Sequence, residues 1–172
     1  MWSLNDIAGL IKDVPDFPKK GVIYKDITPL LENGKAFSSL IQHLKAMVPE
    51  GTTKFIAPES RGFIFGSALA HEMGIGLVLV RKPGKLPRKV VEHSYDLEYG
   101  QDTLQIHKDA LTAQDKVVLI DDVLATGGTA KAAEELCKAL GAKVQKHLFL
   151  MEIEFLKGSE KLDAQVSSLL KV

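Results

Sequence analysis

The strongest chemical signal in the chain is an apolar run that turns through two glycines into a helix-like segment, residues 117–129. Gly127 and Gly128 lack side chains, so the backbone N–H groups of this loop can approach a bound phosphate closely. Thr126 and Thr129 add hydroxyl donors, and the helix that follows adds its positive end. One helix terminus stabilises an anion by only about 0.3 to 2 kcal/mol, so several donors must act together. The loop supplies them, and we predict a phosphate-binding cradle.

Two acidic residues, Asp121 and Asp122, come directly before this loop. A carboxylate repels a phosphate but accepts hydrogen bonds from hydroxyl groups, so the pair suits a sugar attached to the phosphate. The loop lacks the Gly-Lys-Ser/Thr ending of a P-loop, and no Gly-x-Gly-x-x-Gly fingerprint occurs, which disfavours ATPases and dehydrogenases. The alternative is a purely structural turn, in which the acids cap the helix and the glycines permit left-handed backbone.

Two further segments place polar or cationic residues directly after expected strands. Residues 58–63, which include Arg61, follow one strand and open a helix, so their backbone N–H groups form a second candidate anion site. Residues 81–87 place Arg81 and Lys85 beside Pro and Gly turn formers. The alternatives are an exposed ion-pair residue at Arg61 and a solvated basic loop over 81–87.

These segments need elements that bring them together. Short Val- and Ile-rich runs alternate with stretches of helical period, so we expect a single α/β domain over residues 1–172, with a mostly parallel central sheet flanked by helices. The expected strands are 54–57, 76–81, 116–120 and 144–150, and the expected helices are 37–47, 62–72 and 129–140. Pro and Gly interrupt the stretch from Arg81 to Asp109, which predicts a mobile excursion with one hairpin.

Composition disfavours several other classes of protein. The chain has 22 Lys plus Arg and 22 Asp plus Glu, so it lacks the basic excess of nucleic-acid-binding proteins, and we expect no nucleic-acid partner. The apolar runs are too short to span a bilayer and residues 2–12 do not resemble a signal peptide, so we expect no membrane partner and a cytoplasmic location. Cys137 stands alone among alanines, which predicts a buried thiol in a reducing compartment.

Residues 117–129 closely resemble the motif with which type I phosphoribosyltransferases bind phosphoribosyl pyrophosphate (PRPP). The ending of this segment resembles the adenine-specific branch of that family. By this resemblance Asp121 and Asp122 hold the ribose hydroxyls. The residues that wrap the 5-phosphate are then Ala125, Thr126, Gly127, Gly128 and Thr129. The implied fold is that of the family, with a small N-terminal hood over roughly residues 1–32 plus 151–160 and a flexible catalytic loop over roughly 82–107.

The resemblance extends to the base-binding hood. Residues 16–18 and 21–31 are similar to the hood of the adenine-specific branch, which implies that Ile23 packs on the purine and that the backbone at Lys25 reads its hydrogen-bonding edge. Leu156 is expected to close the opposite face of the base. An apolar sandwich suits a flat, neutral purine. Ordinary core packing is the alternative for Ile23 and for Leu156.

The family resemblance also indicates which residues bind the leaving group, pyrophosphate. Ser60 and Arg61 are expected to bind pyrophosphate, with a non-proline cis peptide between them. Arg61, as a catalytic residue, is expected together with Arg81 and Lys85 to stabilise the charge that develops on the departing pyrophosphate.

Residues 94–100 resemble the flexible catalytic loop of the family, and Glu98 has the position associated with proton transfer at the purine. Many relatives that act on oxopurines carry an acid where this chain has Ala125, so a mobile carboxylate is the natural substitute. The alternative for Glu98 is a surface pair with a lysine.

The implied reaction joins adenine to the ribose of PRPP and yields AMP and pyrophosphate, in a homodimer. Mg²⁺ is expected mainly on PRPP oxygens, with Asp121 and Asp122 reaching it through water. Two alternatives stay open at this point. One is a phosphoribosyltransferase for hypoxanthine, guanine or xanthine, which Ala125 and the hood disfavour; the other is a PRPP-sensing regulator without chemistry, which the presence of Glu98 disfavours.

Overall fold

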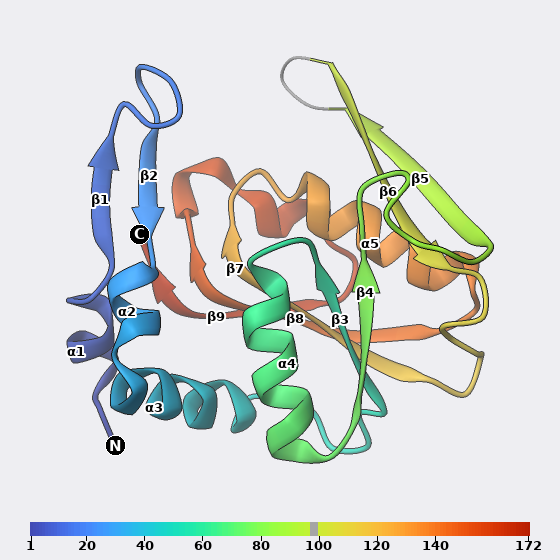
Figure 1. Cartoon of the computed structure of the whole chain (residues 1–172), viewed down its shortest axis with the longest axis horizontal. Coiled ribbons are helices and arrows are strands. Elements are labelled where there is room, and N and C mark those ends of the chain that lie inside the picture. The colour runs from blue at the N-terminus through green and yellow to red at the C-terminus, as the bar shows by residue number, and fades with distance from the viewer. Residues whose placement is uncertain (97–99) are drawn as a thin grey trace. The chain divides into compact units, whose positions relative to one another are not determined.

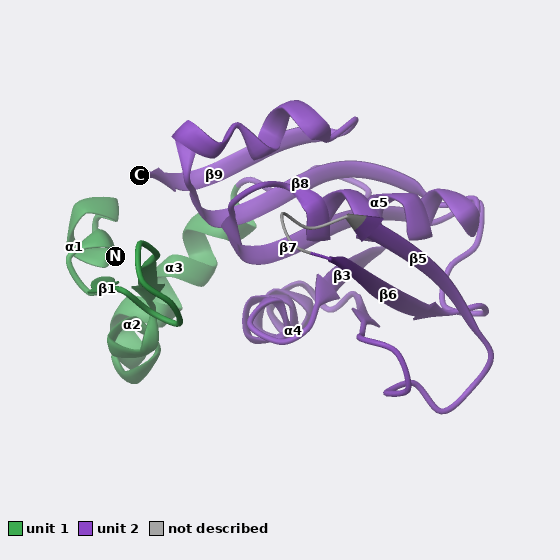
Figure 2. Cartoon of the chain, turned by 90° about the horizontal axis from the view of Figure 1, so that it is seen from above, with its two compact units in different colours: residues 1–46 green, residues 47–172 purple. Residues whose placement is uncertain are grey.

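The computed structural model describes residues 1–96 and 100–172 (Figure 1). The chain falls into two compact units, residues 1–46 and residues 47–172 (Figure 2). A single domain over the whole chain stays a prediction. In the described part of the chain, every helix is too short or too polar to cross a membrane.

The smaller unit combines short helices with an antiparallel strand pair. Its elements are α1 (Leu4–Ala8), β1 (Lys12–Pro15), β2 (Ile23–Asp26), α2 (Thr28–Glu32) and α3 (Gly34–Lys45). The predicted helix over 37–47 is confirmed as α3, which begins three residues earlier because the Asn33 side chain caps it by accepting the N–H of Ala36. Ser39 of α3 accepts the N–H of Trp2 at 3.0 Å, which ties the start of the chain to this helix.

The larger unit is built on a parallel sheet. Its strands are β3 (Lys54–Pro58), β4 (Gly76–Val80), β7 (Lys116–Leu124), β8 (Lys143–Glu152) and β9 (Gln165–Lys171), in the spatial order β4-β3-β7-β8-β9. Neighbouring strands all run parallel. The near-continuous apolar runs of the inner strands follow from burial of both sheet faces. The predicted α/β fold with a mostly parallel central sheet is confirmed.

Two helices cover opposite faces of this sheet. They are α4 (Gly62–Met73) and α5 (Gly128–Ala139). Gly66 of α4 lies against Ala57 and Ile120. Ile56 precedes Ala57 and Leu119 precedes Ile120, so their side chains point to the opposite face of the sheet. On that face they belong to the core cluster that includes the buried residues of α5. The two loops that leave β3 and β7 therefore start at one edge of the sheet and diverge to different faces.

The segment between β4 and β7 forms the expected hairpin. β5 (Val90–Asp96) pairs antiparallel with β6 (Gln101–His107), and Tyr95 lies opposite Asp102. Leu104 and Ile106 of β6 are buried in the same cluster as α5, and the main chain of Gln105 bridges to Arg81 at the end of β4. The hairpin therefore lies beside α5 (Figure 1).

Several elements differ from the prediction. β7 continues four residues past Ile120 and contains both acids, because its ladder with β8 runs on as far as the pair Leu124 and Glu152. Strand β9 and the pair β1–β2 were not predicted. The β9 sequence alternates polar and apolar residues only weakly, and its side chains are half-buried at the sheet edge. Between β8 and β9 the chain makes two 3₁₀ turns, η1 (Glu154–Leu156) and η2 (Gly158–Lys161).

Candidate active site

The predicted phosphate loop encloses a small cavity. It occupies about 90 Å³ at the junction of β7 and α5, and its wall includes Asp121 as well as residues 125–129. Gly127 has a φ of 81°, a left-handed conformation that favours glycine, and turns the chain into the helix. The first hydrogen bond within α5 runs from the Lys131 N–H to the Gly127 carbonyl, which leaves the N–H groups of residues 128–130 without partners inside the helix. These groups are suited to bind an anion.

The shape of the loop depends on a backbone contact with the 3₁₀ segment. A Cβ atom on Gly127 would lie 2.4 Å from the Gly158 carbonyl oxygen, and one on Gly158 would lie 2.2 Å from the Ala125 carbonyl oxygen. Neither position has room for a side chain. The contact also places the turn that carries Leu156, which is half-buried, next to the phosphate loop. Sequence reasoning gave Gly158 no role, because its restriction comes from residues that are distant in the chain.

The two acids meet the second candidate anion site. Arg61 Nε lies 2.7 Å from Asp122 Oδ2, and a Cβ atom on Gly62 would lie 2.9 Å from Asp121 Oδ1. Burial and the charge of Asp122 raise the pKa of Asp121 well above its usual value. Burial also raises the pKa of Asp122, and the positive charge of Arg61 opposes that rise. The loops after β3 and β7 thus form one site, and Arg61 pairs with a buried acid rather than with a surface residue.

Glu59 organises the basic segment that follows β4. Its carboxylate accepts the Arg81 Nε–H at 2.7 Å, the Lys82 backbone N–H at 3.0 Å and the Lys85 ammonium at 2.9 Å. Burial alone would raise the pKa of Glu59, but the hydrogen bonds from Lys85, Arg81 and Lys82 outweigh it and lower the pKa to about 2. The structure therefore brings Arg81 and Lys85 together through an acid that sequence reasoning left without a role.

The non-proline cis peptide lies between Glu59 and Ser60, so the predicted position between Ser60 and Arg61 is wrong by one residue. The Glu59 N–H still donates to the Val80 carbonyl as a continuation of the sheet, whereas the Ser60 carbonyl already accepts from Phe63 at the start of α4. The change of direction therefore falls on the peptide that joins Glu59 to Ser60.

The predicted base-binding residues lie in two places. Ile23 and Lys25 belong to β2 of the smaller unit. The Ile23 side chain is 58% exposed, so ordinary core packing does not account for it, and the Lys25 ammonium lies 2.7 Å from Asp13. Glu98 falls outside the described residues.

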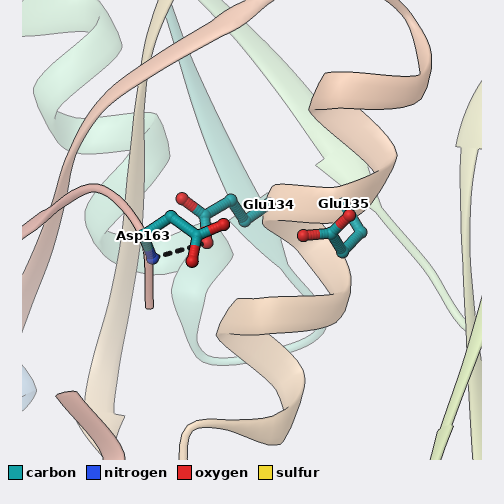
Figure 3. A group of neighbouring side chains, drawn as sticks. All are labelled: Glu134, Glu135 and Asp163. Carbon is teal, nitrogen blue, oxygen red and sulfur yellow. Dashed lines mark hydrogen bonds between the residues drawn. The ribbon is translucent and has the colours of Figure 1, made fainter. Parts of the chain in front are cut away.

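A group of acids at α5 has a structural explanation. Glu134, Glu135 and Asp163 lie close together (Figure 3). Lys131 and Lys138 donate to Asp163 and hold its pKa at about 2. Glu134 accepts the backbone N–H groups of Asp163 and Ala164 at 3.1 and 3.0 Å. These charges are already satisfied by lysines and main chain, and they fasten α5 to the segment that enters β9.

The larger unit thus combines an α/β sheet, a phosphate cradle that follows two acids, and a second, cationic loop. These features define a domain that binds a phosphorylated sugar. A family model described as "Phosphoribosyl transferase domain" matches residues 24–167. The chain therefore belongs to the phosphoribosyl transferase family.

Full-length relatives narrow the assignment. A protein of Caldanaerobacter subterraneus named adenine phosphoribosyltransferase is 50% identical over 171 residues, which covers 98% of this chain and 99% of that protein. The crystal structure of the adenine phosphoribosyltransferase of Thermoanaerobacter pseudethanolicus matches with a TM-score of 0.95 at 48% identity, covering 99% of this chain and all of that one. The Saccharomyces cerevisiae enzyme, solved with adenine and an iminoaltritol bisphosphate, matches with a TM-score of 0.92 at 41% identity over 97% and 98% of the two chains. These relatives place the chain in the adenine phosphoribosyltransferase branch.

Proposed function

We infer that the chain transfers the 5-phosphoribosyl group of PRPP to adenine, giving AMP and pyrophosphate. The observation that carries this conclusion is the cavity of residues 125–129, which has Asp121 on its wall and therefore offers phosphate donors next to a sugar-hydroxyl acceptor. Similarity over the whole chain to proteins named for this activity supports adenine as the base. Ala125 agrees with that choice because it puts no acid beside the base.

The reaction is a displacement at the anomeric carbon of PRPP. The bond from this carbon to the pyrophosphate oxygen breaks while a bond to adenine N9 forms, and positive charge builds on the ribose. Residues 125–129 fix the 5-phosphate, and Asp121 on the cavity wall, with Asp122 next to it in the chain, accepts hydrogen bonds from the ribose hydroxyls. Burial raises the pKa of both acids, whereas the charge of Arg61 favours the ionised form of Asp122, and a carboxylate there stabilises the positive ribose.

The leaving pyrophosphate requires cations in fixed positions. Ser60 and Arg61 lie on the loop that meets the two acids, and Glu59 holds Arg81 and Lys85 on the neighbouring loop. Such preorganised charge is effective because it need not be rearranged as the bond breaks. Adenine must also lose a proton, and we assign its transfer, at N7, to Glu98 from the sequence.

Mg²⁺ fits this arrangement as an ion that arrives with PRPP. Mg²⁺ prefers oxygen ligands, and two carboxylates could supply few of its roughly six, so Asp121 and Asp122 would hold the ion through water while PRPP oxygens would supply direct ligands. When bound, the ion stabilises negative charge on the pyrophosphate oxygens. We also propose a homodimer from the family resemblance. We also propose a cytoplasmic location, which the single, buried Cys137 supports because an unpaired thiol suits a reducing compartment.

The test is base selectivity. The purified protein is incubated with PRPP, Mg²⁺ and adenine, hypoxanthine, guanine or xanthine, and nucleoside monophosphate and pyrophosphate are followed by chromatography. AMP from adenine alone, lost without Mg²⁺, is the expected result. Product from an oxopurine would refute the base assignment, and PRPP binding without any product would favour a sensor.

A further inference from the structure

The hairpin β5–β6 is attached to the phosphate loop through one tyrosine. The Tyr95 ring lies over the first residue of α5, so that a Cβ atom on Gly128 would be 3.2 Å from Cδ2 of the ring. The Tyr95 hydroxyl lies 3.2 Å from the Thr129 hydroxyl, one of the groups on the cavity wall. The second glycine of the loop therefore leaves room for an aromatic ring as well as for a phosphate.

The same tyrosine hydroxyl has a second partner on the neighbouring strand. It donates to Asp102 Oδ2, 3.1 Å away. Lys82 Nζ pairs with this same Asp102 oxygen. The Lys82 backbone N–H in turn donates to Glu59, whose carboxylate holds Arg81. A continuous polar chain thus runs within the larger unit from the cations of the pyrophosphate loop to the 5-phosphate loop.

Counting protons shows what this chain can do. Asp102, paired with Lys82, is a carboxylate and only accepts, so the single Tyr95 proton points to it and Thr129 donates to Tyr95. A bound 5-phosphate also only accepts, and it takes the Thr129 proton. The Thr129 oxygen can then accept from Tyr95, because Lys82 still satisfies Asp102. Hydroxyl rotation alone makes this change, and no side chain has to move.

We propose that Tyr95 is a positioning residue for PRPP: its hydroxyl donates to Asp102 before ligand binds and, once the 5-phosphate is bound, donates to Thr129 and so orients the Thr129 hydroxyl toward the phosphate. With ligand bound, the bonds from Tyr95 to Thr129 and from Thr129 to phosphate run in series. Hydrogen bonds in such a chain polarise one another and become stronger. This inference rests on the proposed function, since it takes residues 125–129 as the 5-phosphate site.

The first test measures binding of ribose 5-phosphate and of pyrophosphate separately by calorimetry. Tyr95→Phe keeps the ring over Gly128 and removes only the hydroxyl. We expect it to weaken ribose 5-phosphate binding roughly 2- to 12-fold, the effect of one ordinary hydrogen bond, with pyrophosphate binding unchanged. Thr103→Val is the matched control, because it removes a hairpin hydroxyl whose partner is Ser94 rather than the phosphate loop, and it should leave both affinities unchanged.

The second test asks whether Tyr95 acts through Thr129. Thr129→Val is expected to weaken ribose 5-phosphate binding, and adding Tyr95→Phe to it should cause no further loss. Additive losses would overturn the proposal, as would an unchanged affinity in Tyr95→Phe or equal losses for ribose 5-phosphate and pyrophosphate, which would indicate general loosening of the hairpin. The proposed function is judged separately, by whether the wild-type protein forms AMP from adenine.

Discussion

Replacement of Gly158 by alanine should damage phosphate binding through one backbone clash. Gly158 does not have a left-handed φ, so alanine is conformationally permitted there and the effect is steric alone. The added Cβ atom would lie 2.2 Å from the Ala125 carbonyl oxygen and 2.9 Å from the Gly127 nitrogen, against an ordinary contact of 3.4 Å or more. Relief requires the Ala125 carbonyl to withdraw by about 1.2 Å, the difference between 3.4 and 2.2 Å.

The size of the effect follows from that displacement. A shift of about 1 Å in a positioning group can cost about 100-fold, and the loss of one charge-assisted hydrogen bond costs about 10- to 140-fold. We therefore expect the KM for PRPP to rise by at least about 10-fold. Forcing a methyl group into a packed contact costs about 1–3 kcal/mol, which lowers the Tm by roughly 2–12 °C in a chain of this size.

The assay combines steady-state kinetics with varied PRPP and thermal unfolding. Gly34→Ala is the control, because a Cβ atom at Gly34 would meet nothing within 4 Å and the residue begins a helix. A Gly158→Ala protein with an unchanged KM for PRPP and an unchanged Tm would show that the loop does not depend on this contact.

Three further predictions concern single residues. The pKa of Glu59 is lowered to about 2, so its contribution to stability is complete above about pH 4.5 and is lost as the pH falls toward 2. The difference in urea unfolding free energy between wild type and Glu59→Gln should therefore shrink between pH 6 and pH 3. A constant difference would contradict this. Burial raises the pKa of Cys137 to about 12, so a thiol reagent should modify it only after unfolding in urea, and rapid labelling of the native protein would be inconsistent with its burial. Glu98→Ala should lower turnover by about 10² to 10⁴ with PRPP affinity retained, as a general acid or base requires, and a loss of PRPP affinity at constant turnover would argue against that role.

The period of the apolar residues and the positions of Gly and Pro were sufficient to predict the main strands and helices of the larger unit. The strand at 54–57 and the helix at 62–72 could be predicted because burial sets the period of apolar residues along each element. The end of β7 was mispredicted because charged residues normally leave a strand, whereas Asp121 and Asp122 stay in the ladder and Arg61 pairs with Asp122. Such pairing joins residues about sixty positions apart, and no local pattern reports it.

The site shows the same division between local and long-range information. The phosphate loop could be predicted because one continuous segment contains its donors, Thr126 to Thr129. The restriction at Gly158 arises from the close approach of the backbone at Ala125 and Gly127, and the role of Glu59 arises from donors that follow a different strand. Composition and spacing carry no record of these approaches, because the segments that meet are distant in the chain.

The strand order has a consequence for where any ligand of this fold must bind. From β3 the chain moves outward to β4 and then returns to place β7 on the other side of β3, so the direction of winding reverses between β3 and β7. Connections that leave two adjacent parallel strands toward opposite faces open a crevice at the carboxyl ends of those strands, the topological switch point of an open α/β sheet. The loops that begin at Glu59 and at Ala125 form the two walls of that crevice. Substitutions in these loops can change which phosphorylated compound is bound, while the winding of the chain keeps the place of binding fixed.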